Sequence, residues 1–329
     1  MAIMSTIVRA RLTWGIRTSP RLRGLARAGA GAVILLAVIL SMGTEPFMRG
    51  LAAVSPVTAA IAFALGAVTT AAAAWRWRVI ARRLGLTLGW GESVSAYYRS
   101  QFLNTVLPGG VLGDIHRAVD HGRTVSRVSQ ASRAVVAERA AGQTVQLALA
   151  TIVVVSVGMS GYAPAVSTVL LAVAVACIGV IVAAAVSARA RSAITRELRT
   201  LRSAFGTGGT VVRVISASSI VILGHVATFV VACLAVGIQA SPERLAALAL
   251  IVMIAGSIPL NIGGWGPREG TAAWAFAGAG LGAAAGIAAT TAFAVLAMIA
   301  VAPGAAVVAA SALRRRHEAR EVQQAVSAP

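Results

Sequence analysis

Apolar residues fill long runs of this 329-residue chain, and charged residues gather in the gaps between the runs. No charged residue occurs from Ala140 to Ala188 or from Gly270 to Leu313. A helix that crosses a bilayer needs about 20 predominantly apolar residues. Each of these two runs is therefore long enough to cross the bilayer, turn back and cross again, and the pattern predicts a polytopic membrane protein.

The same pattern predicts an all-α fold, a polytopic membrane helix bundle of about eight spans with one or two re-entrant broken-helix segments. We place the spans near residues 25–44, 51–74, 136–158, 163–187, 214–238, 245–262, 267–280 and 284–311. The seventh is too short to cross easily by itself. The predicted domains are a basic cytoplasmic N-terminal segment, a transmembrane domain and a basic cytoplasmic tail, over residues 1–24, 25–312 and 313–329.

All 29 basic residues are arginines, and the formal net charge is +19. The arginines lie in clusters between the apolar runs, which is typical of cytoplasmic loops and argues against nucleic acid as a partner. If both termini are cytoplasmic and eight helices cross, 24 arginines fall on the cytoplasmic side and only Arg49 and Arg244 on the other; the remaining three, Arg99, Arg139 and Arg268, lie in or beside apolar segments. This split predicts the inner or plasma membrane. Trp75 and Trp77, on either side of Arg76, are interpreted as an interfacial anchor.

The stretch QFLNTVLPGGVLGDIHRA, residues 101–118, interrupts the apolar pattern with helix-breaking residues followed by charged ones. It supplies the candidate site residues Pro108, Gly109, Gly110, Gly113, Asp114 and Arg117. Residues 92–110 lie between two arginine clusters, so they cannot cross once, and they are too apolar for a solvated loop. We predict a segment that enters from the cytoplasmic side and turns back at the Pro-Gly-Gly; an amphipathic helix in the interface is the alternative.

A second break, IPLNIGGWGPREG, occupies residues 258–270. It supplies the candidate site residues Asn261, Gly263, Gly264, Arg268 and Glu269. Glycine-rich breaks expose backbone N–H groups, and the N-terminus of a following helix suits an anion such as phosphate. An arginine adds bidentate recognition of phosphate, and a carboxylate can hold that arginine in place. Broken helices in matching places of two halves indicate the binding site of a transporter.

Ionisable residues inside an apolar framework are costly, which makes them candidates for function. Asp114, Glu138 and Glu269 each lie within three residues of an arginine. Glu138 and Arg139 begin a predicted span, and snorkelling of their side chains to the interface is the alternative interpretation. His225, alone in an apolar span, is interpreted as a hydrogen-bonded packing residue rather than a proton relay.

The sequence contains no nucleophile motif, phosphate-binding P-loop or paired-histidine helix motif. We therefore predict no catalytic residue and no cofactor. The segment DIHRAVDH, residues 114–121, offers two aspartates and two histidines, but the set is incomplete and no metal site is predicted.

Three segments in this order, FLNTVLPGGVLGDIHRA, RAVVAERAAGQ and IPLNIGGWGPREG, resemble the lysylphosphatidylglycerol synthase transmembrane family, also called flippase-like domain proteins. The family's pattern falls here on Pro108, Gly109, Gly113, Asp114 and Arg117, on Glu138 and Arg139, and on Gly263, Gly264, Arg268 and Glu269. The resemblance covers roughly residues 25–312. It implies a lipid-translocating membrane domain, fused in some members to a soluble aminoacyltransferase. Since this chain lacks such a domain, we expect a transporter rather than a synthase.

The resulting hypothesis is that the protein binds an anionic lipid, a phospholipid or a polyprenyl-phosphate-linked lipid, and translocates it between leaflets. Arg117 and Arg268, with backbone amides, would take the phosphate, while Asp114 and Glu269 would position the arginines. The alternative is a membrane-embedded lipid-modifying enzyme, with acid–base work at Asp114 or Glu138, or its non-catalytic partner in envelope lipid or glycan synthesis. Envelope biosynthesis enzymes are therefore candidate partners. The lipid, the energy source and the oligomeric state stay open, as does whether the two breaks meet in space.

Overall fold

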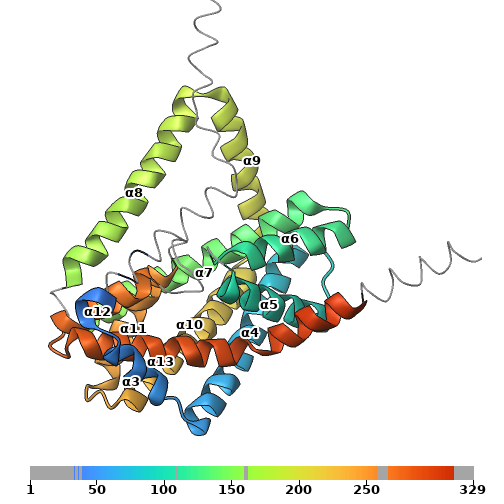
Figure 1. Cartoon of the computed structure of the whole chain (residues 1–329). Helices are drawn as coiled ribbons and strands as arrows, with labels where there is room; N and C mark the ends of the chain where they lie inside the picture. Colours follow the sequence, from blue (N-terminus) through green and yellow to red (C-terminus); the bar gives the residue numbers. More distant parts are fainter. Residues whose placement is uncertain are drawn as a thin grey trace, which may run out of the picture.

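The computed structural model describes residues 33, 36, 39–107, 110–158, 162–257 and 266–314, and Figure 1 shows its helices. Throughout these residues the regular elements are helices, with no strand, which confirms the predicted all-α fold. The helices run in chain order as α3 (Glu45–Ala52), α4 (Pro56–Arg83), α5 (Trp90–Val106), α6 (Leu112–Thr124), α7 (Val128–Ser156), α8 (Ala163–Val186), α9 (Ala188–Phe205), α10 (Gly208–Val236), α11 (Pro242–Gly256), α12 (Pro267–Gly278) and α13 (Ala283–Val301). Helical residues continue after α13 through 303–314.

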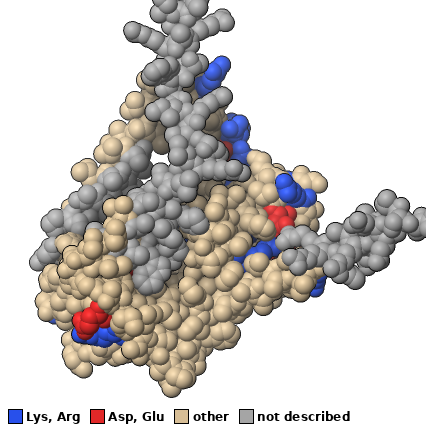
Figure 2. All heavy atoms as spheres, viewed as in Figure 1, with Lys and Arg blue, Asp and Glu red and all other residues tan. Residues whose placement is uncertain are grey.

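Four of these helices, α4, α7, α10 and α13, are long and apolar enough to cross a membrane. The chain is therefore a multi-pass membrane protein; the count of eight spans stays a prediction. On the face seen in Figure 2, uncharged residues occupy the middle of the molecule and charged residues gather toward its ends. This distribution suits a lipid-exposed surface, because hydrocarbon solvates charge poorly.

The two best-packed long helices, α4 and α10, run antiparallel. Arg76 near the end of α4 donates to Ser218 near the start of α10, over 2.9 Å. Further back along α4, Thr69 lies against Gly224 of α10. The start of α7 lies beside the end of α4, since Arg127 donates to the carbonyl of Gly85 over 3.3 Å. One end of the bundle thus holds the end of α4 and the starts of α7 and α10.

Helices α5 and α6 form a hairpin that begins and ends at this same end of the bundle. Residues 107–111 separate the two helices at the predicted Pro-Gly-Gly break. An ion pair between Arg99 and Asp120 joins them. Near the tip, Asn104 Oδ1 accepts the N–H of Gly113 over 2.8 Å, which binds the start of α6 to the end of α5. The structure thus shows two helices separated at the predicted break, while the re-entrant path through the membrane stays a prediction.

Helices α11 and α12 form a second hairpin, at the opposite end of the bundle. With 15 and 12 residues, they measure about 22 and 18 Å at 1.5 Å per residue. Both are short of a hydrocarbon core about 30 Å thick. Arg244, near the start of α11, donates to the carbonyl of Ala279, just after α12. The predicted spans 245–262 and 267–280 thus correspond to two arms whose outer ends are joined, rather than to two full-length helices.

The position of the second hairpin follows from its neighbours. It comes after the end of α10 and before the start of α13. Ala288, near the start of α13, lies against Gly50 of α3, which directly precedes the start of α4. Helices α8 and α9 form a pair of arms that extends away from the rest of the bundle (Figure 1). The two broken hairpins therefore approach each other from opposite ends.

Candidate functional site

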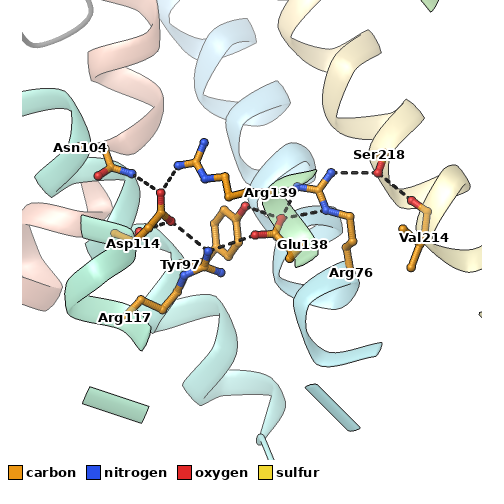
Figure 3. A network of polar contacts seen from close by, with 10 residues as sticks. Arg76, Tyr97, Asn104, Asp114, Arg117, Glu138, Arg139, Val214 and Ser218 are labelled. Carbon is orange, nitrogen blue, oxygen red and sulfur yellow. Dashed lines mark hydrogen bonds and ion pairs between the residues drawn. The ribbon is translucent and has the colours of Figure 1, made fainter. Parts of the chain in front are cut away.

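Glu138 lies at the centre of a buried polar network (Figure 3). It is the eleventh residue of the 29-residue helix α7, and its side chain is 0% exposed. Its Oε1 accepts hydrogen bonds from Arg76 Nε at 2.8 Å and from the Tyr97 hydroxyl at 3.1 Å. Its Oε2 accepts from Arg117 Nη2 at 3.1 Å. One carboxylate thus joins helices α4, α5, α6 and α7.

Asp114 on α6 is the second carboxylate of the network. Its Oδ1 accepts from Ser100 Oγ at 3.0 Å and from Arg117 Nη2 at 2.9 Å. Its Oδ2 accepts from Asn104 Nδ2 at 3.1 Å and pairs with Arg139. Arg117 therefore bridges Asp114 and Glu138. Asp114 holds this arginine in place, as the sequence predicts. Both oxygens of each carboxylate are engaged by donors of the protein.

Arg117 itself is enclosed by aromatic rings. Its guanidinium carbon lies 4.5 Å from the ring centroid of Trp77 and 4.3 Å from that of Tyr97. The residue is 1% exposed. Two of its nitrogens, Nε and Nη1, have no hydrogen-bond partner among the described residues, so the rings supply part of their stabilisation. Arg117 therefore has a structural role at the centre of the network. It does not line the pocket described below.

These contacts alter two interpretations made from the sequence. Trp77 is 0% exposed and packs under Arg117, so it is not an interfacial anchor. Arg76, counted above among the cytoplasmic arginines, is 5% exposed and pairs with Glu138. Both residues lie inside α4 because that helix continues to Arg83, beyond the predicted end of the span near residue 74. Trp77 contacts Arg117 and His121 of α6, and Arg76 bonds to α7 and α10. The sequence of α4 does not encode these contacts.

Arg117→Lys is expected to lower the free energy of unfolding by about 2 kcal/mol, because an ammonium cannot bridge two carboxylates and stack between two rings. Thermal or chemical unfolding in detergent measures this loss. The matched control is Arg49→Lys, whose exposed pair with Glu45 should change stability by less than about 0.5 kcal/mol. Equal effects of the two substitutions would show that the stacking contributes nothing.

A pocket of about 360 Å³ lies beside the network, where the two broken hairpins meet. Gly110 comes from the first break, and Gly256, Ser257 and Arg268 come from the borders of the second. The two segments that the sequence singled out therefore share one cavity. Gly110 has a φ of +62°, a backbone conformation that favours glycine and allows the chain to turn at this wall.

The pocket lies deep along α7. Arg139 and Gln146, which both line it, follow the first residue of α7 by 11 and 18 positions, which corresponds to about 17 and 27 Å of helix. The complete helix of 29 residues is about 43 Å long. The pocket thus lies in the middle part of a helix long enough to cross the bilayer.

Three arginines line the pocket: Arg76, Arg139 and Arg268. No aspartate or glutamate does so within the part of the chain that the structure describes. The side chain of Arg139 is 46% exposed even though it pairs with Asp114. The pairing with Asp114 holds this side chain at the pocket.

Arg268 and Glu269 stand at the start of α12. Glu269 is 0% exposed; its Oε2 accepts the N–H of Gly266 at 2.6 Å and its Oε1 accepts from Arg268 Nε at 3.2 Å. The guanidinium of Arg268 lies 5.4 Å from the centroid of the Phe293 ring. Glu269 therefore caps its own helix and orients the arginine toward the pocket wall.

This capping changes the expected chemistry of the breaks. The Gly266 N–H at the start of α12 is taken by Glu269, and the Gly113 N–H at the start of α6 is taken by Asn104. These two amides are thus not free for an anion. Among the described residues that line the pocket, Arg76, Arg139 and Arg268 carry positive charge.

The remaining predicted site residues lie elsewhere or are not described. Pro108, Gly109, Asn261, Gly263 and Gly264 lie outside the described residues. That the candidate residues of the two breaks bind a lipid stays a prediction.

Sequence reasoning also missed residues that line the pocket, above all Gln143 and Gln146 on α7. Arg139, Gly142, Gln143 and Gln146 follow one another at helical spacing, which places them on one face. That polar stripe in an otherwise apolar span was a signal that could have found them. His225 also lines the pocket, and its Nδ1 lies 2.7 Å from the carbonyl oxygen of Val221, as a packing residue would.

Comparison with known proteins connects this geometry to a family. The sequence model of the family described as "Lysylphosphatidylglycerol synthase TM region" matches residues 25–320. This match includes both breaks and the complete polar network. No curated protein matches the chain, and no solved structure does.

Proposed function

The protein belongs to the lysylphosphatidylglycerol synthase TM region family, and from that premise we propose that it binds an anionic, phosphate-bearing lipid in the pocket and moves the headgroup between leaflets. The observation that carries the proposal is the pocket itself, where Arg76, Arg139 and Arg268 line a cavity between two broken hairpins. Guanidinium groups are suited to phosphate because they donate parallel hydrogen bonds to its oxygens.

The electrostatics of the site support an anionic ligand. The network next to the pocket contains three arginines, Arg76, Arg117 and Arg139, against the two carboxylates Asp114 and Glu138. One positive charge is therefore left uncompensated within this set, and Arg268 is balanced by Glu269. An excess positive charge beside a pocket attracts an anion. A phosphate in the pocket would neutralise this excess.

The arrangement of the hairpins supports movement as well as binding. They reach the pocket from opposite ends of the bundle, so in the proposed orientation each lies between the pocket and one side of the membrane. Broken helices at the binding site are a common feature of transporters that open alternately to the two sides. We propose that the two hairpins are the elements that open in turn, with the α5–α6 hairpin on the cytoplasmic side.

That assignment rests on the arginine distribution, which predicts cytoplasmic termini and an inner or plasma membrane. The enzyme alternative has less support, because both oxygens of Asp114 and of Glu138 already accept bonds from protein donors. A role with envelope biosynthesis enzymes stays a prediction.

Arg139→Gln is expected to slow lipid exchange about tenfold or more, because hydrogen bonds to a charged group contribute about 1.5–3 kcal/mol. The assay uses purified protein in liposomes with phosphatidylglycerol labelled on an acyl chain, and dithionite reports the label in the accessible leaflet. Asp114 keeps Ser100, Asn104 and Arg117 as partners in this variant, so the fold should persist.

The matched control is Arg133→Gln on the same helix, since Arg133 pairs with Glu197 away from the pocket. Its exchange rate should equal that of the wild type. Exchange by the wild-type protein no faster than in protein-free vesicles would refute translocation of this lipid. Equal exchange rates for Arg139→Gln and Arg133→Gln would show that Arg139 takes no part in binding the lipid.

A further inference from the structure

The neutral polar residues of the pocket indicate which chemical groups the headgroup carries besides its phosphate. Besides its arginines, the pocket is lined by the neutral polar side chains of Gln101, Asn104, Thr105, Gln143, Gln146 and Ser257. Amide and hydroxyl groups both donate and accept hydrogen bonds. A wall of this kind is complementary to a ligand that bears several hydroxyl groups.

Some of this hydrogen-bonding capacity is unused by the protein. Gln146 Nε2 is buried and has no hydrogen-bond partner among the described residues. A buried unpaired donor costs about 1–3 kcal/mol, so such groups usually have a partner in the functional state. Gln101 uses its Oε1 to accept from Thr70 at 2.9 Å, and no bond of its Nε2 occurs within the described part of the chain. Both donors belong to residues that line the pocket.

The carboxylates of the site are not free to bind an amine. Asp114, Glu138 and Glu269 each have both oxygens engaged by donors of the protein. An ammonium group in the pocket would therefore face arginines and find no open carboxylate among the described residues. Like charges at close range in a desolvated site repel strongly.

The aromatic rings of the pocket are also occupied. Quaternary ammonium groups such as choline are commonly bound over the faces of aromatic rings. The two aromatic residues that line the pocket, within the described ranges, are Tyr97 and Phe293. Arg117 lies over the Tyr97 ring and Arg268 over the Phe293 ring, at 4.3 and 5.4 Å from the centroids. These cations compete with a choline group for the same rings.

We propose that the headgroup is a phosphate joined to a small uncharged polyol, such as glycerol or a single sugar, and that the pocket rejects amine-bearing headgroups, including the lysyl group in the family's name. This inference rests on the proposed function. The arginines take the phosphate, and Gln101, Gln143 and Gln146 take the hydroxyl groups. A volume of about 360 Å³ is at the lower end of small-molecule sites and suits one small headgroup rather than an oligosaccharide.

The test compares lipids that carry the same labelled acyl chain in the same vesicles. Phosphatidylglycerol and phosphatidylinositol offer phosphate with hydroxyl groups, phosphatidic acid offers phosphate alone, and phosphatidylcholine and lysylphosphatidylglycerol carry a cation. We expect the two polyol lipids to exchange about tenfold faster than the two cationic ones, because an unpaired charge in the pocket costs more than one lost hydrogen bond. Phosphatidic acid should fall between the two groups.

Substitutions separate recognition of the hydroxyl groups from recognition of the phosphate. Gln146→Leu should lower the ratio of phosphatidylglycerol to phosphatidic acid exchange about fivefold, the effect of one lost hydrogen bond. Thr144→Val is the matched control, since Thr144 is exposed on the same helix, bonds to the carbonyl of Ala140 and does not line the pocket. It should leave the ratio unchanged.

The outcomes distinguish this inference from the function on which it rests. If no lipid exchanges faster than in protein-free vesicles, the proposed function fails. If lysylphosphatidylglycerol or phosphatidylcholine exchanges as fast as phosphatidylglycerol, the polyol inference fails while the translocation proposal stands. The same holds if Gln146→Leu leaves the ratio of phosphatidylglycerol to phosphatidic acid at the wild-type value.

Discussion

Glu138→Gln is expected to lower the free energy of unfolding by about 3–5 kcal/mol, the usual cost of removing one partner from a buried ion pair. Glu138 is 0% exposed and accepts bonds from Arg76 and Arg117, which are 5% and 1% exposed. Without its charge, the three arginines of the network would be balanced by Asp114 alone. The loss is measured by unfolding the protein in detergent. Unfolding is monitored by the protection of buried cysteine from a thiol reagent, or by light scattering on heating.

A matched control and a double variant identify the cause. Glu197→Gln removes a carboxylate that is 49% exposed and pairs with Arg133 at the surface, so it should cost less than about 1 kcal/mol. The double variant Arg76→Gln with Glu138→Gln removes one charge of each sign. If uncompensated charge is the cause, the double variant should be more stable than Glu138→Gln alone. A double variant whose loss is the sum of the two single losses would contradict this explanation.

Gly113→Ala is expected to lower the free energy of unfolding by about 1–3 kcal/mol, the typical cost of overpacking. A Cβ at Gly113 would lie 2.0 Å from the backbone oxygen of Ser100 on the facing helix. Because that neighbour is backbone and not the end of a flexible side chain, α5 and α6 must separate. The hydrogen bond from the Gly113 N–H to Asn104 would be strained at the same time.

The direction of this effect is informative, because alanine is favoured over glycine in a helix by about 1 kcal/mol. Gly91→Ala on α5 is the matched control, since nothing lies within 4 Å of a Cβ at that position. It should leave the stability unchanged or raise it. Comparison of the unfolding midpoints of the two variants tests the packing of the hairpin, and a Gly113→Ala protein as stable as the control would contradict the close approach.

The first of these predictions concerns contacts between helices that are distant in the sequence. The pairing of Arg76 with Glu138 joins residues 62 positions apart, and the bond from Arg76 to Ser218 joins residues 142 positions apart. Such contacts leave no pattern among neighbouring residues of the sequence. The sequence pattern therefore places Arg76 in a cytoplasmic loop and Trp77 at the interface, although both are buried in the structure and belong to the site.

The family and the all-α fold were accessible from the sequence, because each depends on local information. Long apolar runs predict membrane helices from the cost of exposing polar groups to lipid. The first break was placed correctly between α5 and α6, since Pro and Gly disrupt helices wherever they occur. The charged residues near the breaks were recognised as unusual for the same local reason, the cost of charge in an apolar setting.

The sequence by itself thus determined a multi-pass, all-helical membrane protein of this family, with a helix break after α5 and charged residues inside the apolar framework. Only the tertiary structure decided that the two breaks share one pocket and that Arg139 lines it while Arg117 does not. It also decided that α11 and α12 form a hairpin. The physical reason is that helix formation and membrane insertion depend on the residues of one segment, whereas a pocket depends on which faces of distant helices pack together.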